Sequence, residues 1–314
     1  MSARDTLPID ALRADFNDAL ARGPVVVTSP TGSGKSTQVP RWLGGPVLVV
    51  EPRRLACRAL AARVAELEGV PLGGAVGYNV RDERRASDDT RVLFVTPGVA
   101  LRMADAWGRY AAVVIDELHE RNLDTDLLLA LLQKRGAPKL VAMSATLDGA
   151  RVAAHLGARL LRVDVRTFPV ELRHLADGPA QLPTREGVEA RVRRALDAAA
   201  HDPGDVLVFL PGKGEIDDCA RALWSRRDVE VIPLHGGLNL DEQRRAFAPA
   251  RRRKVILSTN VAETSLTLPG VGVVIDAGLV LDVPVDGQVL LPSDAEDVAP
   301  VAHPRGRVAR ERGQ

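Results

Sequence analysis

The sequence is poor in aromatic residues, in cysteine and in long apolar runs, and each shortage excludes a class of protein. Aromatic residues make up 3% of the 314 positions, which argues against the base-stacking platforms of RNA-recognition or OB-type modules. Cys57 and Cys219 lie far apart and outside any metal-ligand spacing, which favours reduced cytoplasmic thiols. No apolar run approaches the roughly 18 residues of a membrane span, and the N-terminus lacks the pattern of a signal peptide. We therefore expect a cytoplasmic protein without membrane association.

The sequence also has almost no excess of charge of either sign, because 42 basic residues are nearly balanced by 41 acidic ones. The net charge of +1 does not by itself indicate a nucleic-acid-binding protein. Lysine occurs at five positions, so the other 37 of the 42 basic residues are arginine. This excess fits phosphate binding, because the guanidinium fork matches phosphate oxygens, and it fits a GC-rich genome equally well.

A glycine-rich segment follows an apolar run at residues 24–28. Residues 29–37 read Ser-Pro-Thr-Gly-Ser-Gly-Lys-Ser-Thr, the pattern of a phosphate-binding P-loop after a buried strand. In such a loop backbone N–H groups face the phosphates, the lysine reaches the β- and γ-phosphate oxygens, and the serine hydroxyl binds Mg²⁺. The strict pattern begins with glycine where this chain has Ser29, and a chance Gly-Lys-Ser is the alternative. We predict an ATP and Mg²⁺ site formed by Thr31, Gly32, Ser33, Gly34, Lys35, Ser36 and Thr37.

Short apolar runs alternate with amphipathic segments along the whole chain, which is typical of a parallel α/β fold. Strands are predicted at residues 25–28, 47–50, 92–96, 112–116 and 140–144, and again at 206–210, 230–232, 255–258 and 271–276. Helices are predicted near residues 55–66, 123–132, 215–224 and 241–247. Residues 166–185 contain three prolines and a glycine, which indicates a linker or an irregular entry to a second domain. We expect two α/β domains, residues 1–167 and 168–314, with the P-loop in the first.

Two polar segments follow predicted strands downstream of the P-loop. Asp116 and Glu117 end one apolar run, and in a P-loop enzyme the first acid completes the Mg²⁺ site while the second activates the attacking water. The alternative is a helix start with favourable charge. Residues 144–146 read Ser-Ala-Thr, which alone indicates only a helix N-cap. The order of the three segments favours the catalytic interpretation.

In this order the motifs resemble those of the DEAH-box RNA helicases of superfamily 2, especially their bacterial HrpB-like branch. Residues 51–55 are similar to motif Ia, residues 77–81 to the segment after it, and residues 96–98 stand at motif Ib. Residues 116–121, Asp-Glu-Leu-His-Glu-Arg, match motif II with Leu118 in place of the usual alanine. Residues 209–212 and 234–238 resemble motif IV and the segment after it. Residues 258–267 form a nearly unbroken motif V, the most specific signal in the chain.

The resemblance implies two tandem RecA-like domains with mainly parallel sheets, and ATP bound in the cleft between them. Carried over by position, it implies that Arg54, Arg81, Thr96 and Thr259 contact the RNA backbone, where arginine forks and hydroxyl donors suit phosphates and sugars. It also implies that the adenine lies between Arg63 and Phe247, without a strong preference for one base. The alternatives are a solvent-exposed helix position for Arg63 and a core position for Phe247.

The same resemblance implies the catalytic roles. Lys35 and Ser36 would hold phosphate and Mg²⁺, Asp116 would complete the metal site, and Glu117 would activate water. Arg307 and Arg310 would reach the γ-phosphate. The expected function is an RNA-stimulated ATPase of the ATP-dependent RNA helicase type, a monomer that binds single-stranded RNA, with DNA as a partner left open. The alternatives are an impaired helicase fragment that only binds nucleotide, and a P-loop NTPase with no nucleic-acid role.

The resemblance weakens toward the C-terminus. Motif VI of the family reads Gln-Arg-x-Gly-Arg-x-Gly-Arg, whereas residues 303–310 read His-Pro-Arg-Gly-Arg-Val-Ala-Arg. Arg307 and Arg310 are retained, but His303 and Pro304 replace the leading glutamine and arginine, and an arginine-rich tail is the alternative interpretation. The chain ends at Gln314, where family members continue into winged-helix and further domains. It is therefore expected to be a helicase truncated after its second RecA-like domain.

Overall fold

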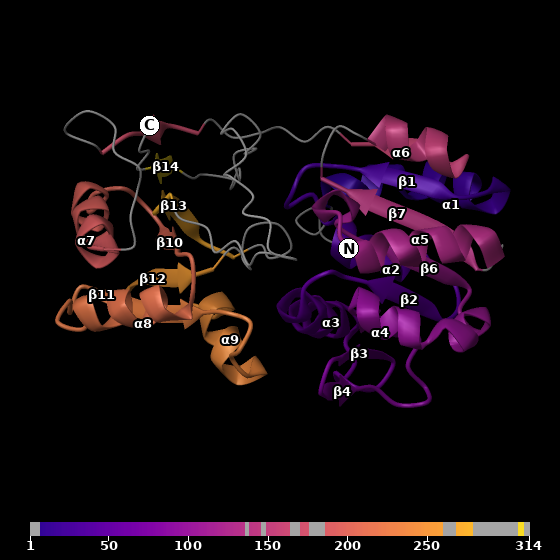
Figure 1. Ribbon diagram of the computed structural model, residues 1–314, viewed down its shortest axis with the longest axis horizontal. Coiled ribbons are helices and arrows are strands. Elements are labelled where there is room, and N and C mark those ends of the chain that lie inside the picture. Colours follow the sequence, from indigo (N-terminus) through magenta and orange to yellow (C-terminus); the bar gives the residue numbers. More distant parts are fainter. Residues whose placement is uncertain are drawn as a thin grey trace. The chain divides into compact units, whose positions relative to one another are not determined.

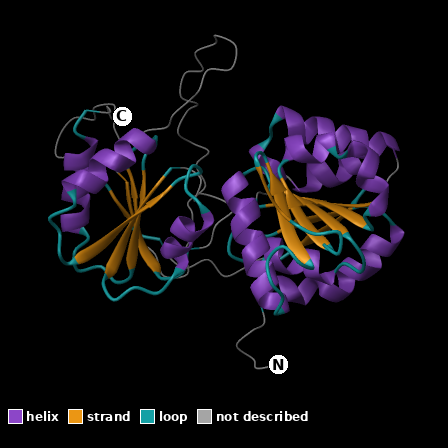
Figure 2. Ribbon diagram, turned by 90° about the horizontal axis from the view of Figure 1, so that it is seen from below, coloured by secondary structure: helices purple, strands orange, loops and turns teal. Residues whose placement is uncertain are grey.

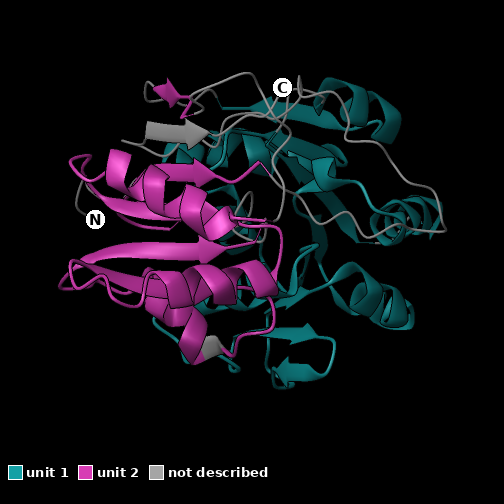
Figure 3. Cartoon of the chain, turned by 60° about the vertical axis from the view of Figure 1, so that its left-hand side comes forward, with its two compact units in different colours: residues 1–166 teal, residues 167–314 magenta. Residues whose placement is uncertain are grey.

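A computed structural model of the chain describes residues 7–135, 138–145, 149–163, 170–175, 186–259 and 268–278, and the backbone of Arg307–Arg310. The contacts divide the chain into two compact units, Met1–Arg166 and Thr167–Gln314, which are coloured separately in Figure 3. Each unit has its own sheet and its own hydrophobic core. Within the described ranges, none of the helices combines the length and the apolar character needed to cross a bilayer.

The sheet of the first unit has eight strands in the order β4-β3-β5-β2-β6-β7-β1-β8. Neighbouring strands are parallel except for β3 with β4. The carboxyl ends of parallel strands meet at one edge, so the segments that follow them gather there. The strands are β1 (Val25–Thr28), β2 (Val47–Val50), β3 (Val76–Val80), β4 (Glu83–Arg85), β5 (Val92–Val95), β6 (Ala112–Ile115), β7 (Lys139–Ser144) and β8 (Arg159–Arg162).

Helices cover both faces of this sheet, as Figures 1 and 2 show. Connections between parallel strands must cross over a face, and here they do so through helices. The α-helices are α1 (Arg13–Arg22), α2 (Lys35–Trp42), α3 (Arg54–Glu68), α4 (Pro97–Arg102), α5 (Leu123–Arg135) and α6 (Gly149–Leu156). Three short 3-10 helices accompany them, η1 (Pro8–Leu12), η2 (Ala104–Arg109) and η3 (Leu118–Glu120).

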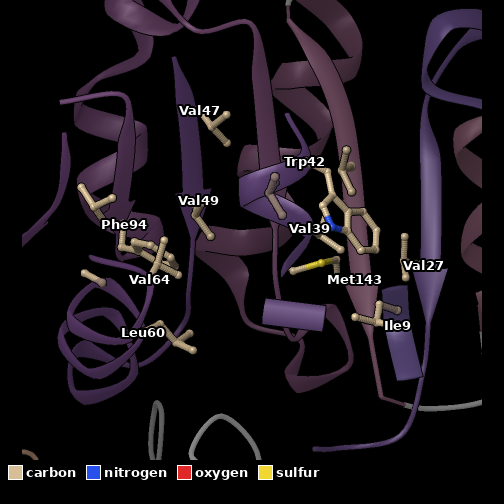
Figure 4. Packing of buried hydrophobic residues seen from close by; sticks show 14 of the residues in the cluster. Ile9, Val27, Val39, Trp42, Val47, Val49, Leu60, Val64, Phe94 and Met143 are labelled. Atoms are coloured by element: carbon tan, nitrogen blue, oxygen red, sulfur yellow. The ribbon is translucent and has the colours of Figure 1, made fainter. Parts of the chain in front are cut away.

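The core of the first unit lies on both faces of its sheet because successive strand residues point in opposite directions. Val27 packs on one face with Trp42 and Met143 (Figure 4). Val26 and Leu48 belong to the cluster on the opposite face. Burial on both faces explains why these strands are continuous apolar runs, and each fully buried side chain of this size contributes about 1.5 to 3 kcal/mol. The central strands, and the loops at their ends, are therefore firmly held.

The second unit has a six-stranded parallel sheet in the order β11-β12-β10-β13-β14-β9. Apolar residues of α7 and α8 pack on β10, β12 and β13 to form its core. The strands are β9 (Leu172–Arg173), β10 (Asp205–Phe209), β11 (Val229–Leu234), β12 (Arg253–Ser258), β13 (Val271–Asp276) and β14 (Arg307–Arg310). The helices are α7 (Val188–Ala198), α8 (Lys213–Ala222) and α9 (Leu240–Phe247).

The predicted α/β class with mainly parallel sheets is confirmed. The nine predicted strands correspond to β1, β2, β5, β6, β7, β10, β11, β12 and β13, and the four predicted helices to α3, α5, α8 and α9. Five further strands were not predicted: β3, β4, β8, β9 and β14. The linker predicted at residues 166–185 lies mostly outside the described residues.

Candidate functional site

The P-loop connects β1 to α2 at the carboxyl edge of the first sheet. Gly32 and Gly34 adopt φ angles of 77° and 95°, in the left-handed region that strains other residues. Gly34 is the N-cap of α2, so the first backbone N–H groups of that helix have no partner within it. Free N–H groups at the positive end of a helix form a phosphate-binding surface.

Two buried serines fix the inner side of this loop. Ser29 and Ser33 are 3% and 0% exposed, and their hydroxyl oxygens lie 2.7 Å apart in a hydrogen bond. Ser29 occupies the position of the first glycine of the strict motif, and its buried side chain is accommodated by the hydrogen bond to Ser33. The Ser33 hydroxyl is thus bonded to Ser29, and the Ser33 amide donates to the Pro30 carbonyl at 3.3 Å. Thr37 donates its hydroxyl to the Gly34 carbonyl at 3.1 Å.

Lys35 and Glu117 form a buried ion pair that joins the P-loop to the end of β6. Lys35 Nζ lies 3.0 Å from Glu117 Oε1, and the two residues are 4% and 2% exposed. Burial alone would lower the pKa of Lys35, but the charges of Glu117 and Asp116 outweigh burial and raise it. Burial, reinforced by Asp116, raises the pKa of Glu117 to about 7. Lys35 thus stays protonated, and a carboxyl group able to exchange a proton near neutral pH lies beside it.

Asp116 presents an unpaired oxygen to the same site. Its Oδ1 accepts a hydrogen bond from the Glu117 amide at 2.9 Å, while Oδ2 is buried without a hydrogen-bond partner. A buried carboxylate oxygen without a donor is suited to a cation. Mg²⁺ usually takes one or two protein ligands together with substrate phosphates, so a single free carboxylate oxygen close to the P-loop is chemically suited to it.

The backbone after β6 is strained where the acidic pair lies. Glu117 has φ 49° and ψ 42°, a left-handed conformation that costs a non-glycine residue roughly 1 to 2 kcal/mol. Strain of this kind is retained where the surroundings determine the conformation, and it is common at functional sites. Here it places the Glu117 side chain beside Lys35 instead of letting β6 continue.

His119 links motif II to the segment after β7. Its Nδ1 lies 3.3 Å from Glu117 Oε2 and 3.5 Å from the Ala145 amide nitrogen. Burial, together with the nearby Lys35 charge, lowers the pKa of His119, so the imidazole is neutral at pH 7 and the contact with Glu117 is not an ion pair. The acidic pair at residues 116–117 and the described part of the second polar segment, Ser144 and Ala145, therefore lie side by side; Thr146 lies outside the described residues.

Two arginines predicted to contact RNA lie together on the first unit. Arg54 Nη2 donates to the Arg81 carbonyl at 2.8 Å, and the Arg81 side chain is 79% exposed. Thr96 is the N-cap of α4, but its side chain makes no capping hydrogen bond, so its hydroxyl is not used there. An open hollow of about 650 Å³ adjoins Arg81 and is lined also by Arg84 and Arg102, and by the acidic residues Asp82 and Glu83. This face offers several guanidinium groups to an anionic ligand.

The remaining predicted site residues are not brought together by the described structure. Arg63 is 55% exposed on α3 and pairs with Glu66 at 2.7 Å. Phe247 ends α9 and is partly buried, and Thr259 follows β12. Arg63 belongs to the first unit, whereas Phe247 and Thr259 belong to the second. Arg307 and Arg310 lie in β14, of which only the backbone is described. The roles of these five residues, like those of the other predicted site residues, stay predictions.

One support of the site was missed by the sequence. The turn η1 packs against the P-loop: the Ile9 amide donates to the Ser33 carbonyl at 3.2 Å, and a Cβ at Gly34 would lie 2.6 Å from Leu7 Cδ1. Ile9 is fully buried in the core beside Val27 and Met143 (Figure 4). Its only signal in the sequence is a short apolar cluster before the first predicted strand.

Two family models match the chain, one in each unit. Residues 13–154 match the DEAD/DEAH box helicase model, and residues 189–312 match the helicase conserved C-terminal domain. The first match contains the P-loop and the Asp116–Glu117 pair. The second contains α9 and β12.

Curated relatives and solved structures agree with these matches. ATP-dependent RNA helicase HrpB of Escherichia coli (strain K12) is 40% identical over 292 residues, which are 86% of this chain and 36% of that protein. ATP-dependent RNA helicase HrpA of the same organism is 37% identical over 293 residues, or 87% of this chain and 22% of HrpA. The chain thus spans little more than a third of HrpB and less than a quarter of HrpA.

Among solved structures, the crystal structure of Escherichia coli DEAH/RHA helicase HrpB superposes with a TM-score of 0.77 at 40% identity, over 86% of this chain and 37% of HrpB. A crystal structure of the E. coli DExH-box NTPase HrpB gives a TM-score of 0.72 at 32% identity, over 100% of this chain and 42% of that one. Together with the two family models, these similarities show that the chain belongs to the DEAD/DEAH box helicases.

Proposed function

We propose that the chain is an ATPase of the RNA helicase type whose hydrolysis of ATP is stimulated by single-stranded RNA. The observation that carries the proposal is the 3.0 Å contact between Lys35 and Glu117 beside the unpaired Oδ2 of Asp116. This contact brings together the phosphate-binding loop, the Glu117 carboxyl group, whose pKa is raised to about 7, and the Asp116 oxygen that has no hydrogen-bond partner. Hydrolysis of a phosphoanhydride needs these three components.

In this proposal the nucleotide occupies the P-loop. The backbone N–H groups of Gly32 and Gly34 and those at the start of α2 hold the phosphates, and Lys35 leaves Glu117 to bind the β- and γ-phosphate oxygens. Mg²⁺, when bound, neutralises charge on those oxygens, and Ser36 and Asp116 are the residues that would hold it. Glu117, released from Lys35, orients the attacking water and accepts its proton.

RNA is proposed to lie along the arginine-bearing face of the first unit. The exposed Arg81, the neighbouring Arg54 and the Thr96 hydroxyl would bind phosphates and sugars, which gives affinity without reading the bases. The near-zero net charge means that attraction depends on this local face rather than on the whole molecule. The names of HrpB and HrpA as RNA helicases favour RNA over a partner without nucleic acid.

The second unit is proposed to complete both sites. Phe247 and Arg63 would stack on the two faces of the adenine, Thr259 would add an RNA contact, and Arg307 with Arg310 would stabilise charge on the γ-phosphate. The domain division proposed with these roles is residues 1–167 for ATP binding and 168–314 for the C-terminal helicase domain. We further propose that the protein acts as a monomer.

The test is ATP hydrolysis measured with and without unstructured single-stranded RNA. We expect measurable turnover that rises with RNA, and loss of both nucleotide binding and turnover in Lys35→Ala. No turnover, with nucleotide binding intact, would favour an impaired helicase that only binds ATP. Turnover that is indifferent to RNA would favour an NTPase acting elsewhere. Repeating the measurement with single-stranded DNA of equal length then shows whether stimulation of ATP hydrolysis requires the 2′-hydroxyl groups of RNA.

A further inference from the structure

Helix α9, which ends at Phe247, has little apolar anchorage of its own. Among its described side chains only Gln243 and Ala246 are buried. Its first turn is held by a capping box, in which Asn239 accepts from the Glu242 amide at 3.0 Å and Glu242 accepts from the Asn239 amide at 2.9 Å. With so small a buried area, the position of its last turn depends on polar contacts.

Lys254 supplies those contacts at the C-terminal end of α9. This residue lies in β12, is 2% exposed, and its Nζ donates to the Ala246 carbonyl at 2.9 Å and to the Ala248 carbonyl at 3.0 Å. Asp205, the first residue of β10, completes the set with Oδ2 at 3.3 Å from Nζ. The three ammonium protons therefore have three acceptors, and two of these are carbonyls left unpaired where a helix ends.

The two carbonyls held by Lys254 flank Phe247 on either side. Fixing the backbone of Ala246 and Ala248 fixes the Cα–Cβ direction of the residue between them. A buried, fully satisfied ammonium group is a rigid anchor, because removing it takes their shared partner from Asp205 Oδ2 and from both carbonyls. Phe247 is only partly buried, so the packing of its own ring holds it less firmly.

We infer that Lys254, together with Asp205, is a positioning residue that aims Phe247 at the adenine of the bound nucleotide. The inference rests on the proposed function, which places Phe247 on the base. Lys254 acts through the backbone of α9 and has no contact with the nucleotide. Its loss should therefore weaken recognition of the base and leave the phosphate chemistry of the first unit unchanged.

The experiment compares two substrates, ATP and ribose 5′-triphosphate, which lacks the base. In Lys254→Met the KM for ATP should rise about tenfold, toward the lower end of what the loss of a base–aromatic stack costs. The kcat for ATP and the KM for ribose 5′-triphosphate should stay within about twofold of the parent. Phe247→Ala should behave in the same way, and adding Lys254→Met to Phe247→Ala should raise the KM no further, because the two residues act as one unit.

Arg253→Met is the matched control. Arg253 is the neighbour of Lys254 on β12 and likewise donates to carbonyls, those of Gly204 at 2.7 Å and Ala199 at 2.8 Å. These carbonyls lie beyond α7, far along the chain from Phe247. A general loosening of the sheet would raise the KM in Arg253→Met as much as in Lys254→Met, and that result would overturn the inference.

The remaining outcomes are equally decisive. A raised KM for ATP in Phe247→Ala with a parental KM in Lys254→Met rejects the role of Lys254 and leaves the proposed function intact. No effect of Phe247→Ala rejects its adenine contact, and the inference with it. If Lys254→Met does not fold, Asp205→Asn replaces it: the lysine remains but loses its counter-charge. A KM for ATP that stays at the parental value in that variant rejects the inference.

Discussion

At the scale of single residues, the contact between Lys35 and Glu117 would keep the proposed hydrolytic site inactive without nucleotide. The lysine neutralises the carboxylate and occupies one of its oxygens at 3.0 Å. Phosphates that draw Lys35 away expose that oxygen at the same time. Both consequences of binding, phosphate capture and release of the proposed base, thus depend on one ion pair.

The first prediction tests this role of Glu117. Glu117→Gln should keep ATP affinity within a few-fold of the parent and slow hydrolysis by roughly 10²-fold or more, since general-base contributions are of that size. Nucleotide titration and single-turnover hydrolysis measure the two quantities. Glu68→Gln is the control, because Glu68 pairs with Arg41 on the surface of the same unit. Hydrolysis by Glu117→Gln at the parental rate would remove the residue from the mechanism.

The second prediction concerns the Cys219 thiol. Burial, with the nearby charge of Glu189, raises its pKa from 9.0 to about 12. Below pH 9.0 the thiol is protonated in both the folded and the unfolded state. Between pH 9.0 and pH 12 it ionises mainly in the unfolded state, so the free energy of unfolding falls as pH rises through this range. At pH 10 the loss should reach roughly 1 kcal/mol.

Denaturant unfolding at pH 8 and pH 10 measures this loss. Cys219→Ala should lose correspondingly less stability than the parent between the two pH values, while the other groups that titrate there contribute equally to both proteins. Equal losses in the two proteins would show that the native thiol ionises normally.

At the scale of elements, the sequence predicted those strands whose burial on both faces makes them continuous apolar runs, such as β1 and β2. It missed β3, β4 and β8 for identifiable reasons. The β3 sequence Val-Gly-Tyr-Asn-Val is interrupted by glycine and asparagine, β4 is Glu-Arg-Arg, and β8 is an edge strand with two apolar residues. These strands form because β5 and β1 provide pairing partners, and that information is not local.

Local sequence patterns were likewise insufficient to predict the contacts within the candidate site. The order of the motifs predicted that the P-loop and Asp116–Glu117 belong to one catalytic site. It could not predict the direct Lys35–Glu117 contact, which depends on the left-handed backbone of Glu117. Nor could it predict that Lys254 reaches the end of α9, because a buried lysine in a strand has no pattern of its own. Contacts between distant segments were accessible only through the structure.

The third prediction belongs to the β3–β4 hairpin and α3, which carry Arg81 and Arg54. Nucleic-acid binding should fall steeply with salt and be nearly independent of base sequence, because phosphate contacts release counterions. Arg54→Ala and Arg81→Ala should weaken all sequences alike, and each should reduce the salt slope by about one unit. Fluorescence anisotropy with several unstructured RNAs of equal length measures both effects. Arg22→Ala, at the end of α1, is the control, and strong discrimination between these RNAs would contradict the proposal.

At the scale of the whole molecule, the proposed hydrolysis needs the second unit as well as the first. An arginine supplied to a developing phosphoryl charge contributes about 10³ to 10⁵ in rate, so Arg307→Ala and Arg310→Ala should each remove most of the turnover while ATP binding stays nearly intact. Point substitution is the suitable test because β14 lies between β13 and β9, and deleting residues 303–314 would take a strand out of that sheet. Arg312→Ala removes the same charge just beyond β14 and should keep the parental rate. If Arg307→Ala and Arg310→Ala also hydrolyse ATP at the parental rate, with RNA present at saturation, residues 303–310 are not motif VI, and any turnover that remains must come from the first unit alone.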